Sequence, residues 1–203
     1  MKNIFYIQHT GELGGATYKL IELLNHIDKK KFNPSVIFLS NGEGVDIVKN
    51  LGIETRVHLN ISTYANSEGA HYSFRTFRPW YPITKIFEII PSTLRFYKIL
   101  KKIDADLIHI NTSTQIPSLL AAYFTRKKCI FHVREVLRRG NFGIRRKIIQ
   151  LLIEKCSNKV ICIAKHNADQ IIKSKKVFTI YDSVNFKYFN PDISKNYFRS
   201  KNI

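Results

Sequence analysis

Residues 3–27 read NIFYIQHTGELGGATYKLIELLNHI. Asn3–Gln8 is a nearly continuous apolar run, which is typical of a strand buried on both faces of a parallel sheet. Three glycines interrupt the pattern, and a helix is then predicted over Ala16–Ile27, whose three leucines share one stripe. A strand, a glycine-rich turn and a helix in direct succession predict the first unit of an α/β domain.

The same alternation continues along the chain. Further strands are predicted at Ser35–Leu39, Glu54–His58, Asp106–Ile110, Lys128–Val133, Lys159–Ile163 and Val177–Tyr181. Further helices are predicted at Val45–Asn50, Ile116–Phe124, Ile144–Cys156 and Ala164–Ile172. Six or seven short strands separated by helices predict an open, doubly wound parallel sheet. The length of 203 residues suits one large α/β domain or two small ones.

Residues 60–82 break this alternation. They show no clear periodicity but hold six aromatic residues between Tyr64 and Tyr81. A long helix is predicted to follow over Ile83–Lys102, with Pro91 beginning or bending it rather than lying at its middle. Long insertions in compact α/β domains are more often functional than accidental, so segment 60–102 is a candidate functional insertion.

The chain is strongly basic. Lys and Arg number 33 against 15 Asp and Glu, a net charge of +18, which indicates an anionic partner such as nucleic acid, a lipid surface or a phosphorylated substrate. Residues 71–147 hold sixteen basic and four acidic residues, so +12 of this excess lies in the part that includes the aromatic insertion.

Basic and aromatic residues together suit contact with anionic lipid, and they also suit single-stranded nucleic acid. A solvated basic surface without a partner is a third interpretation. The lipid interpretation assigns membrane contact to Arg75, Arg78, Trp80 and Tyr81.

Cysteine usage and the chain start bear on location. Cys129, Cys156 and Cys162 form no CxxC pair and have no histidine at metal-ligand spacing, so no metal site is predicted. Cys129 and Cys162 are expected to be buried, and an odd count without a framework suits a reducing compartment. The apolar start is too short for a signal peptide, and no stretch reaches the length of a membrane span. A cytoplasmic protein is expected, with peripheral contact at the inner face of the plasma membrane as one option.

The glycine-rich turn is the first candidate site. His9 and Thr10 precede a G-x-x-G-G pattern that ends in Gly14 and Gly15 at a helix start, where free amides favour a phosphate or carboxylate. The pattern is not G-x-G-x-x-G, and no acidic residue follows the second strand at Leu39-Ser40, which disfavours a dinucleotide site. Glycines that merely shape the turn are the alternative.

Two further motifs follow predicted strands. Asn111, Thr112 and Ser113 could hydrogen-bond sugar hydroxyls or cap the next helix, and His109 is expected to be a core histidine. The other motif contains His132, Arg134, Glu135 and Arg138. Its imidazole could shuttle a proton or donate to a phosphate that the arginines bind, and a solvated loop with a surface Arg–Glu ion pair is the alternative.

Five segments occur in an informative order. They are Gly14-Gly15-Ala16, Asp106–His109, Phe131–Glu135, Lys159–Ala164, and Val177–Asn185 with Phe189–Pro191. In this order they resemble the amino-terminal domain of family-four glycosyltransferases of the GT-B fold. The last segment is similar to a family strand ending in Asn-Gly-Val-Asp, but Asp182, Ser183 and Asn185 stand where the family has Asn, Gly and Asp.

The resemblance implies a Rossmann-like domain over residues 1–190, the acceptor-side half of a GT-B fold, with residues 191–203 beginning an interdomain linker. It implies retaining transfer from a nucleotide-sugar donor, without another cofactor, to a saccharide or lipid-linked saccharide in bacterial surface polysaccharide synthesis. The donor would be held by a second Rossmann-like domain, so this half is expected to be inactive alone.

The resemblance also implies residue roles. His132 would be catalytic, lying near the transferred sugar, while the two glycines approach the donor phosphates. Electrostatic stabilisation of the departing diphosphate would be the main catalytic effect. The residues expected to bind substrate are His9, Thr10, Gly14, Gly15, Asn111, Thr112, Ser113, Arg134, Glu135 and Arg138.

Two rival functions stay open. A nucleic-acid-binding α/β module without enzymatic activity would explain the charge, although no C₂H₂, RNP-like or KH motif is present. A nicotinamide-dependent enzyme would need the dinucleotide fingerprint that the first turn lacks.

Overall fold

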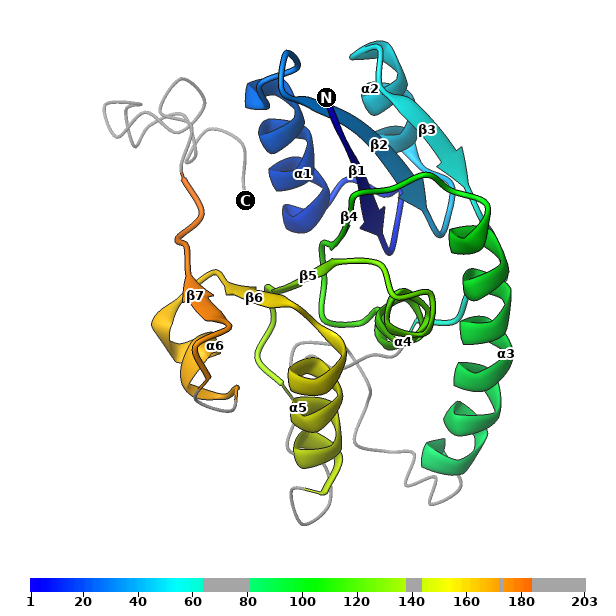
Figure 1. Ribbon diagram of the computed structural model, residues 1–203, viewed down its shortest axis with the longest axis vertical. Coiled ribbons are helices and arrows are strands. Elements are labelled where there is room, and N and C mark those ends of the chain that lie inside the picture. The colour runs from blue at the N-terminus through cyan, green and yellow to red at the C-terminus, as the bar shows by residue number, and fades with distance from the viewer. Residues whose placement is uncertain (64–80, 138–143, 172–173, 184–203) are drawn as a thin grey trace, which may run out of the picture.

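Strand β1 (Lys2–Gln8) lies inside a parallel sheet, paired with β2 (Phe32–Phe38) on one side and with β4 (Leu107–Ile110) on the other. The computed structural model describes residues 1–63, 81–137, 144–171 and 174–183. Within these residues the sheet has seven strands in the order β3-β2-β1-β4-β5-β6-β7 (Figure 1). The other strands are β3 (Glu54–Val57), β5 (Cys129–Val133), β6 (Lys159–Cys162) and β7 (Val177–Thr179).

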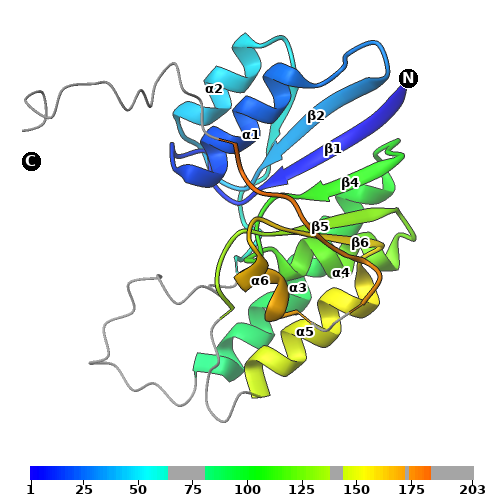
Figure 2. The same ribbon diagram turned by 90° about the vertical axis from the view of Figure 1, so that its left-hand side faces the viewer.

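Helices cover both faces of the sheet. They are α1 (Gly15–His26), α2 (Glu43–Asn50), α3 (Tyr81–Lys101), α4 (Ile116–Phe124), α5 (Ile144–Cys156) and the short α6 (Lys165–Asp169). Helices α1 and α2 lie on one face, and α3, α4 and α5 lie side by side on the other (Figures 1 and 2). This arrangement confirms the predicted doubly wound α/β fold.

The apolar core of the described chain divides between the two faces because side chains alternate along each strand. On β1, Phe5 and Ile7 pack in the cluster beneath α3–α5, whereas Ile4 and Tyr6 pack in the cluster beneath α1 and α2. Both faces of β1 are therefore covered, which explains why its sequence is apolar without alternation.

Helix α3 corrects one prediction. Pro91 was expected to begin or bend this helix, but it lies at the middle of one helix that runs from Tyr81 to Lys101. Pro91 is exposed, and because proline has no amide hydrogen, the Phe87 carbonyl lacks its usual partner in the helix. Buried Phe96 and Leu100 hold the second half of the helix against the core.

The insertion is described only in part. Arg75, Arg78 and Trp80 lie outside the described residues, and Tyr81 is the first residue of α3. None of the helices in the described chain is both long enough and apolar enough to cross a membrane.

The three cysteines are free thiols in the core, as expected for Cys129 and Cys162. Burial raises the pKa of the Cys162 thiol to about 11. Burial also raises the pKa values of Cys129 and Cys156. These groups therefore stay protonated at neutral pH and act as small apolar side chains.

Candidate functional site

Polar side chains from three neighbouring strands meet at the carboxyl edge of the sheet. Gln8 ends β1, and its Nε2 donates to Thr17 Oγ1 at 3.0 Å. Asn111 follows β4, and its Nδ2 donates to Gln8 Oε1 at 2.7 Å. Arg134 follows β5, and its Nε donates to Asn111 Oδ1 at 3.3 Å. The sequence motifs therefore converge here, as the parallel topology requires.

The far end of this chain of hydrogen bonds is an ion pair. Arg134 Nη1 donates to both carboxylate oxygens of Asp182, at 2.7 and 3.1 Å, and the Arg134 side chain is only 9% exposed. The alternative interpretation, a surface ion pair between Arg134 and Glu135, is wrong, because Arg134 pairs with Asp182 instead. Charge-assisted bonds of this kind are shorter and stronger than neutral ones.

Glu135 instead ties β5 to the turn after β4. Its Oε2 accepts from Ser113 Oγ at 2.6 Å and from the Ser113 amide at 3.1 Å. The alternative that residues 111–114 cap the next helix is wrong. The N-cap of α4 is Gln115, which makes no side-chain capping bond, and Thr112 Oγ1 bonds Thr114 Oγ1 at 2.9 Å.

Two histidines lie beside this network. His109 Nε2 is 3.4 Å from His132 Nδ1, and the His109 ring also packs on Tyr6, with 5.0 Å between ring centroids. Each histidine is only 8% exposed, which confirms His109 as a core histidine. Burial, reinforced by the Arg134 charge, lowers the pKa of His109 to about 4 and that of His132 to about 2. Both rings are therefore neutral at physiological pH.

One ring nitrogen of this histidine pair is left without a hydrogen bond in the described part of the chain. His132 Nε2 is buried and has no hydrogen-bond partner among the described residues. A neutral imidazole can donate or accept one hydrogen bond there, depending on its tautomer. Proton shuttling through imidazolium is disfavoured, since the depressed pKa of His132 opposes the charged form. Leaving a buried polar atom unpaired is costly, so this nitrogen points to a ligand contact.

His9 and Thr10 belong to the turn after β1. Burial lowers the pKa of His9 while the Glu135 carboxylate acts in the opposite direction, so the first and third sequence motifs interact. His9 Nδ1 is buried and has no hydrogen-bond partner in the described chain. Thr10 Oγ1 accepts from the Glu12 amide at 3.1 Å and from Ser40 Oγ at 3.2 Å, so it shapes the turn.

The glycines of the turn fall into two kinds. A Cβ on Gly11 would lie 2.7 Å from backbone atoms of the β2–α2 loop, and Gly44 and Gly42 are equally confined. The Gly44 amide donates to the Gly11 carbonyl at 2.8 Å where the two loops cross. A Cβ on Gly14 or Gly15 would meet no described atom within 4 Å. Close packing therefore explains why glycine occupies positions 11, 42 and 44, but it does not explain the glycines at positions 14 and 15.

Gly14 and Gly15 also open a helix. Gly14 is the N-cap of α1, and within the described chain neither a side-chain cap nor an acidic first-turn residue satisfies the helix start. Such amides carry partial positive charge and bind anions readily. The exposed glycine pair thus leaves room for an anionic group to reach these amides at the same sheet edge as His132.

No protein-family profile matches the sequence. A curated relative from Escherichia coli, a UDP-Gal:alpha-D-GlcNAc-diphosphoundecaprenol alpha-1,3-galactosyltransferase, is 28% identical over an alignment of 123 residues, with coverage of 54% of this chain and 31% of that protein. The structure of Anabaena HepE in complex with UDP and glucose matches with a TM-score of 0.64 and 16% identity, covering 99% of this chain and 50% of that one. The lipopolysaccharide outer core galactosyltransferase WaaB matches with a TM-score of 0.57 and 11% identity, covering 92% and 47%.

The fold is that of one half of a GT-B glycosyltransferase. The chain spans about a third of the curated relative and about half of each solved structure. The resemblance stated from the sequence motifs is confirmed for the fold.

A strap closes the carboxyl edge of this GT-B half. After β7 the chain crosses the strand ends and reaches α1 (Figure 2). Lys19 donates to the Ser183 carbonyl, and Ser183 Oγ donates to Glu22 Oε1 at 3.2 Å. The strap, residues 180–183, also carries Asp182, the partner of Arg134.

The sequence motifs missed three members of the site in this GT-B half. Gln8 and Thr17 read as the end of a strand and the start of a helix, yet they begin the hydrogen-bond network. Asp182 appeared only as a departure from the family pattern. A polar residue that ends an apolar strand was the available signal for Gln8. Arg138 lies outside the described residues.

Proposed function

We propose that this chain is the acceptor-side half of a retaining glycosyltransferase. It would act with a nucleotide-sugar donor and a saccharide or lipid-linked saccharide acceptor, in assembly of a bacterial surface polysaccharide. The observation that carries the proposal is the pairing, at one sheet edge, of the open glycine turn at Gly14 and Gly15 with the unpartnered His132 Nε2. The names of the relatives, a galactosyltransferase acting on a diphosphoundecaprenol lipid and a protein bound to UDP and glucose, support it.

The turn supplies the electrostatic part of the mechanism. Transfer from a nucleotide-sugar builds negative charge on the departing diphosphate, and preorganised amides at a helix start stabilise such charge. A glycine lets a phosphate oxygen approach the backbone, which a Cβ would obstruct. Gly14 and Gly15 are therefore assigned to the diphosphate.

His132 is assigned to the sugar. Because the imidazole of His132 is neutral, its Nε2 would form one hydrogen bond with a sugar hydroxyl. This bond would orient the sugar for transfer. Arg134 is already paired with Asp182 and bonded to Asn111, so it holds the site together and keeps a positive charge beside His132. The polar side chains after β4 and β5 would complete the acceptor side.

The remaining parts of the proposal concern the whole protein. Residues 1–190 form the acceptor-binding domain, 191–203 begin a linker, and a second Rossmann-like domain holds the donor, so this half is inactive alone. No cofactor besides the nucleotide-sugar is proposed. The enzyme would work in the cytoplasm at the inner membrane face, with Arg75, Arg78, Trp80 and Tyr81 contacting lipid.

The test uses the full-length gene product. Purified protein is incubated with UDP-galactose or UDP-glucose and a polyprenyl-diphosphate sugar, and the product linkage is determined by NMR. We expect transfer with retained anomeric configuration. His132→Asn should lower the rate about a hundredfold, the size of effect seen for one lost transition-state hydrogen bond.

The matched control is His166→Asn, an exposed histidine on α6, which should leave transfer unchanged. Wild-type rates in His132→Asn would remove that residue from the reaction. Inverted products would refute retention, and absence of transfer with every nucleotide-sugar would refute the function. Salt-dependent binding of oligonucleotides without any response to sugars would favour the nucleic-acid-binding alternative.

A further inference from the structure

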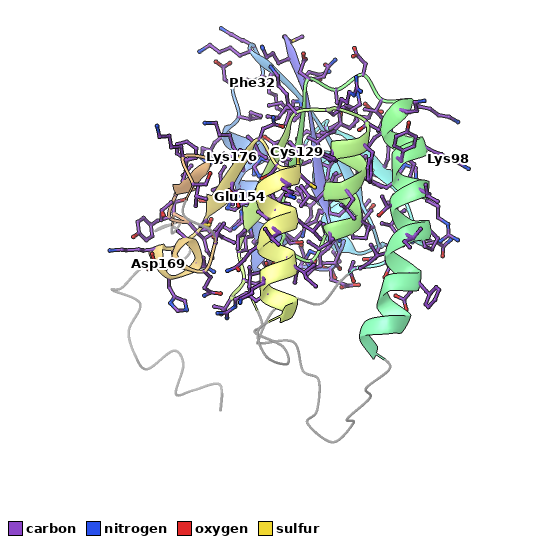
Figure 3. The ribbon with its side chains drawn as sticks, turned by 60° about the horizontal axis from the view of Figure 1, so that its bottom comes forward. Phe32, Lys98, Cys129, Glu154, Asp169 and Lys176 are labelled. Carbon is purple, nitrogen blue, oxygen red and sulfur yellow. The ribbon has the colours of Figure 1, made fainter. Side chains whose placement is uncertain are left out.

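Helices α3, α4 and α5 expose an apolar surface that the proposed reaction does not use. Seven large apolar side chains on these helices are exposed, counted among residues whose side chains are described. They are Phe87, Ile90, Leu94, Tyr123, Phe124, Ile148 and Leu151. On the opposite layer, α1 and α2 expose only Tyr18 and Leu23 within the described chain. We call the outer surface of α3, α4 and α5 the α3–α5 face (Figure 3).

The α3–α5 face contains a groove. An open cavity of about 480 Å³ lies between α3 and α4. Its lining comprises Ile89, Ile90, Thr93, Leu94, Tyr97, Leu120 and Phe124. Thr93 Oγ1 in this lining is buried and has no hydrogen-bond partner among the described residues. The groove therefore offers apolar walls and one uncommitted hydroxyl.

Charge distinguishes the two layers even more than apolar exposure. Helices α3 and α5 each hold four basic residues and one acidic residue, and α4 holds none, a net charge of +6. Helices α1 and α2 together hold two basic and three acidic residues, a net charge of −1. The turn after α4 adds Arg126, Lys127 and Lys128 to the basic side. A partner of the α3–α5 face must therefore be both apolar and anionic.

On α3 and on α5, exposed apolar side chains share a stripe with lysines. On α3, Phe87, Ile90 and Leu94 share one stripe that continues as Lys98 and Lys101. On α5, exposed Ile148 and Leu151 are followed at the same spacing by Lys155. Both helices follow strands of a parallel sheet, so both begin at its carboxyl edge. Lys98, Lys101 and Lys155 thus lie toward the ends of the helices farther from the candidate site, and on α5 exposed Lys147 flanks the apolar side chains on the nearer side as well.

We infer that the α3–α5 face is a docking surface for an anionic phospholipid bilayer, with the groove taking part of a hydrocarbon chain. Apolar side chains would enter the acyl boundary while the flanking lysines contact anionic headgroups. A second copy of this chain is a poorer occupant, because two faces of charge +6 repel each other. This inference extends the proposed membrane location, but its test needs no sugar transfer.

The experiment is co-sedimentation of the whole chain with vesicles. Vesicles of phosphatidylcholine alone are compared with vesicles of equal parts phosphatidylcholine and phosphatidylglycerol, at low and high salt. We expect binding to the anionic vesicles that weakens with salt and little binding to the neutral ones. Absence of binding to anionic vesicles at low salt would overturn the inference.

Matched charge variants locate the surface. Lys98→Glu with Lys101→Glu should weaken binding at least about tenfold, since each lysine near such a surface is worth about 1 kcal/mol. Lys30→Glu with Lys31→Glu makes the same charge change at exposed positions away from the α3–α5 face, and should cost less than about threefold. Equal losses in both variants would overturn the assignment to this face.

Matched apolar variants test the groove side. Ile90→Asp with Leu94→Asp should abolish binding, whereas Tyr18→Asp with Leu23→Asp on α1 should retain it. All four side chains are exposed, and circular dichroism verifies that each variant folds. The lipid partner would be overturned if the wild type dimerised with increasing concentration and Ile90→Asp with Leu94→Asp lost this dimerisation while still binding vesicles. The α3–α5 face would then be assigned to self-association. Oligonucleotide binding that depends on Lys98 and Lys101, without vesicle binding, would overturn it as well.

Discussion

The buried imidazoles of His109 and His132 make folding sensitive to acid. In the unfolded chain a histidine has its ordinary pKa near 6.5, whereas burial lowers the pKa of His109 to about 4 and that of His132 to about 2. Below about pH 6.5 the unfolded state binds protons that the folded state does not. The free energy of unfolding is therefore highest above this pH and falls as pH drops from 6.5 through the folded pKa of about 4.

The expected slope is about 1.4 kcal/mol per pH unit for each imidazole that stays neutral in the folded state. Urea unfolding followed by circular dichroism between neutral pH and mild acid measures it. His132→Gln should remove one imidazole's share of the slope, and His166→Gln, exposed on α6, should leave it unchanged. A slope that is the same in His132→Gln and the wild type would contradict the buried neutral state.

Gly11 and Gly15 are expected to differ in how replacement by alanine changes the free energy of unfolding. Gly15→Ala should keep or raise the free energy of unfolding by up to about 1 kcal/mol, because a Cβ there meets nothing and alanine favours a helix. Gly11→Ala should lower it by about 1–3 kcal/mol, because its Cβ would lie 2.7 Å from backbone. Urea midpoints of the two variants decide this. Equal destabilisation would mean that Gly15, too, is a structural glycine.

Single residues also show which side-chain contacts could not be predicted from the sequence. Polar residues after β4 and β5 were predictable because parallel strands bring their carboxyl ends to one edge. Their partners were not. Arg134 reaches Asp182 rather than the adjacent Glu135 because the strap places Asp182 beside it, 48 positions along the chain. Side-chain pairing of this kind depends on where the backbone returns, which no local pattern encodes.

Elements were predicted best where a helix has clear ends. The bounds of α4 and α5 agree with the predicted Ile116–Phe124 and Ile144–Cys156. The last helix is shorter than predicted, ending at Asp169 rather than Ile172. Helix α3 runs through Pro91 because tertiary packing of its second half outweighs the local preference of proline for a helix start.

Pro91 is expected to make α3 less stable than the same helix with alanine at this position. Pro91→Ala restores the amide that can donate to the Phe87 carbonyl, and it removes the ring clash in the preceding turn. Because Pro91 is exposed, no core contact is lost. The free energy of unfolding should rise by up to about 3 kcal/mol, measured by urea unfolding. Leu94→Ala, exposed one turn later, is the control and should change it little; a drop in Pro91→Ala would show that the proline is required.

The whole molecule has two dissimilar layers on one sheet. The candidate site occupies the carboxyl edge, and the basic apolar layer of α3–α5 faces away from α1 and α2 (Figure 2). Composition indicated the charge but not its separation into +6 and −1, because the sequence pattern does not say which helices share a face. The alternating strands and helices predicted a parallel sheet, and its strand order became known only from the structure.

The sheet order also determines when, during translation, β1 can pair with both of its neighbouring strands. Strand β1 leaves the ribosome first, but its second neighbour, β4, begins only at Leu107, and the strap that fastens α1 arrives near Ser183. A nascent chain stalled before Leu107 should therefore be cut readily by protease in β1, and one extended past Ser183 should resist; equal resistance would show that the first unit folds alone. Until β4 has been synthesised, β1 keeps one unpaired edge that a chaperone can reach.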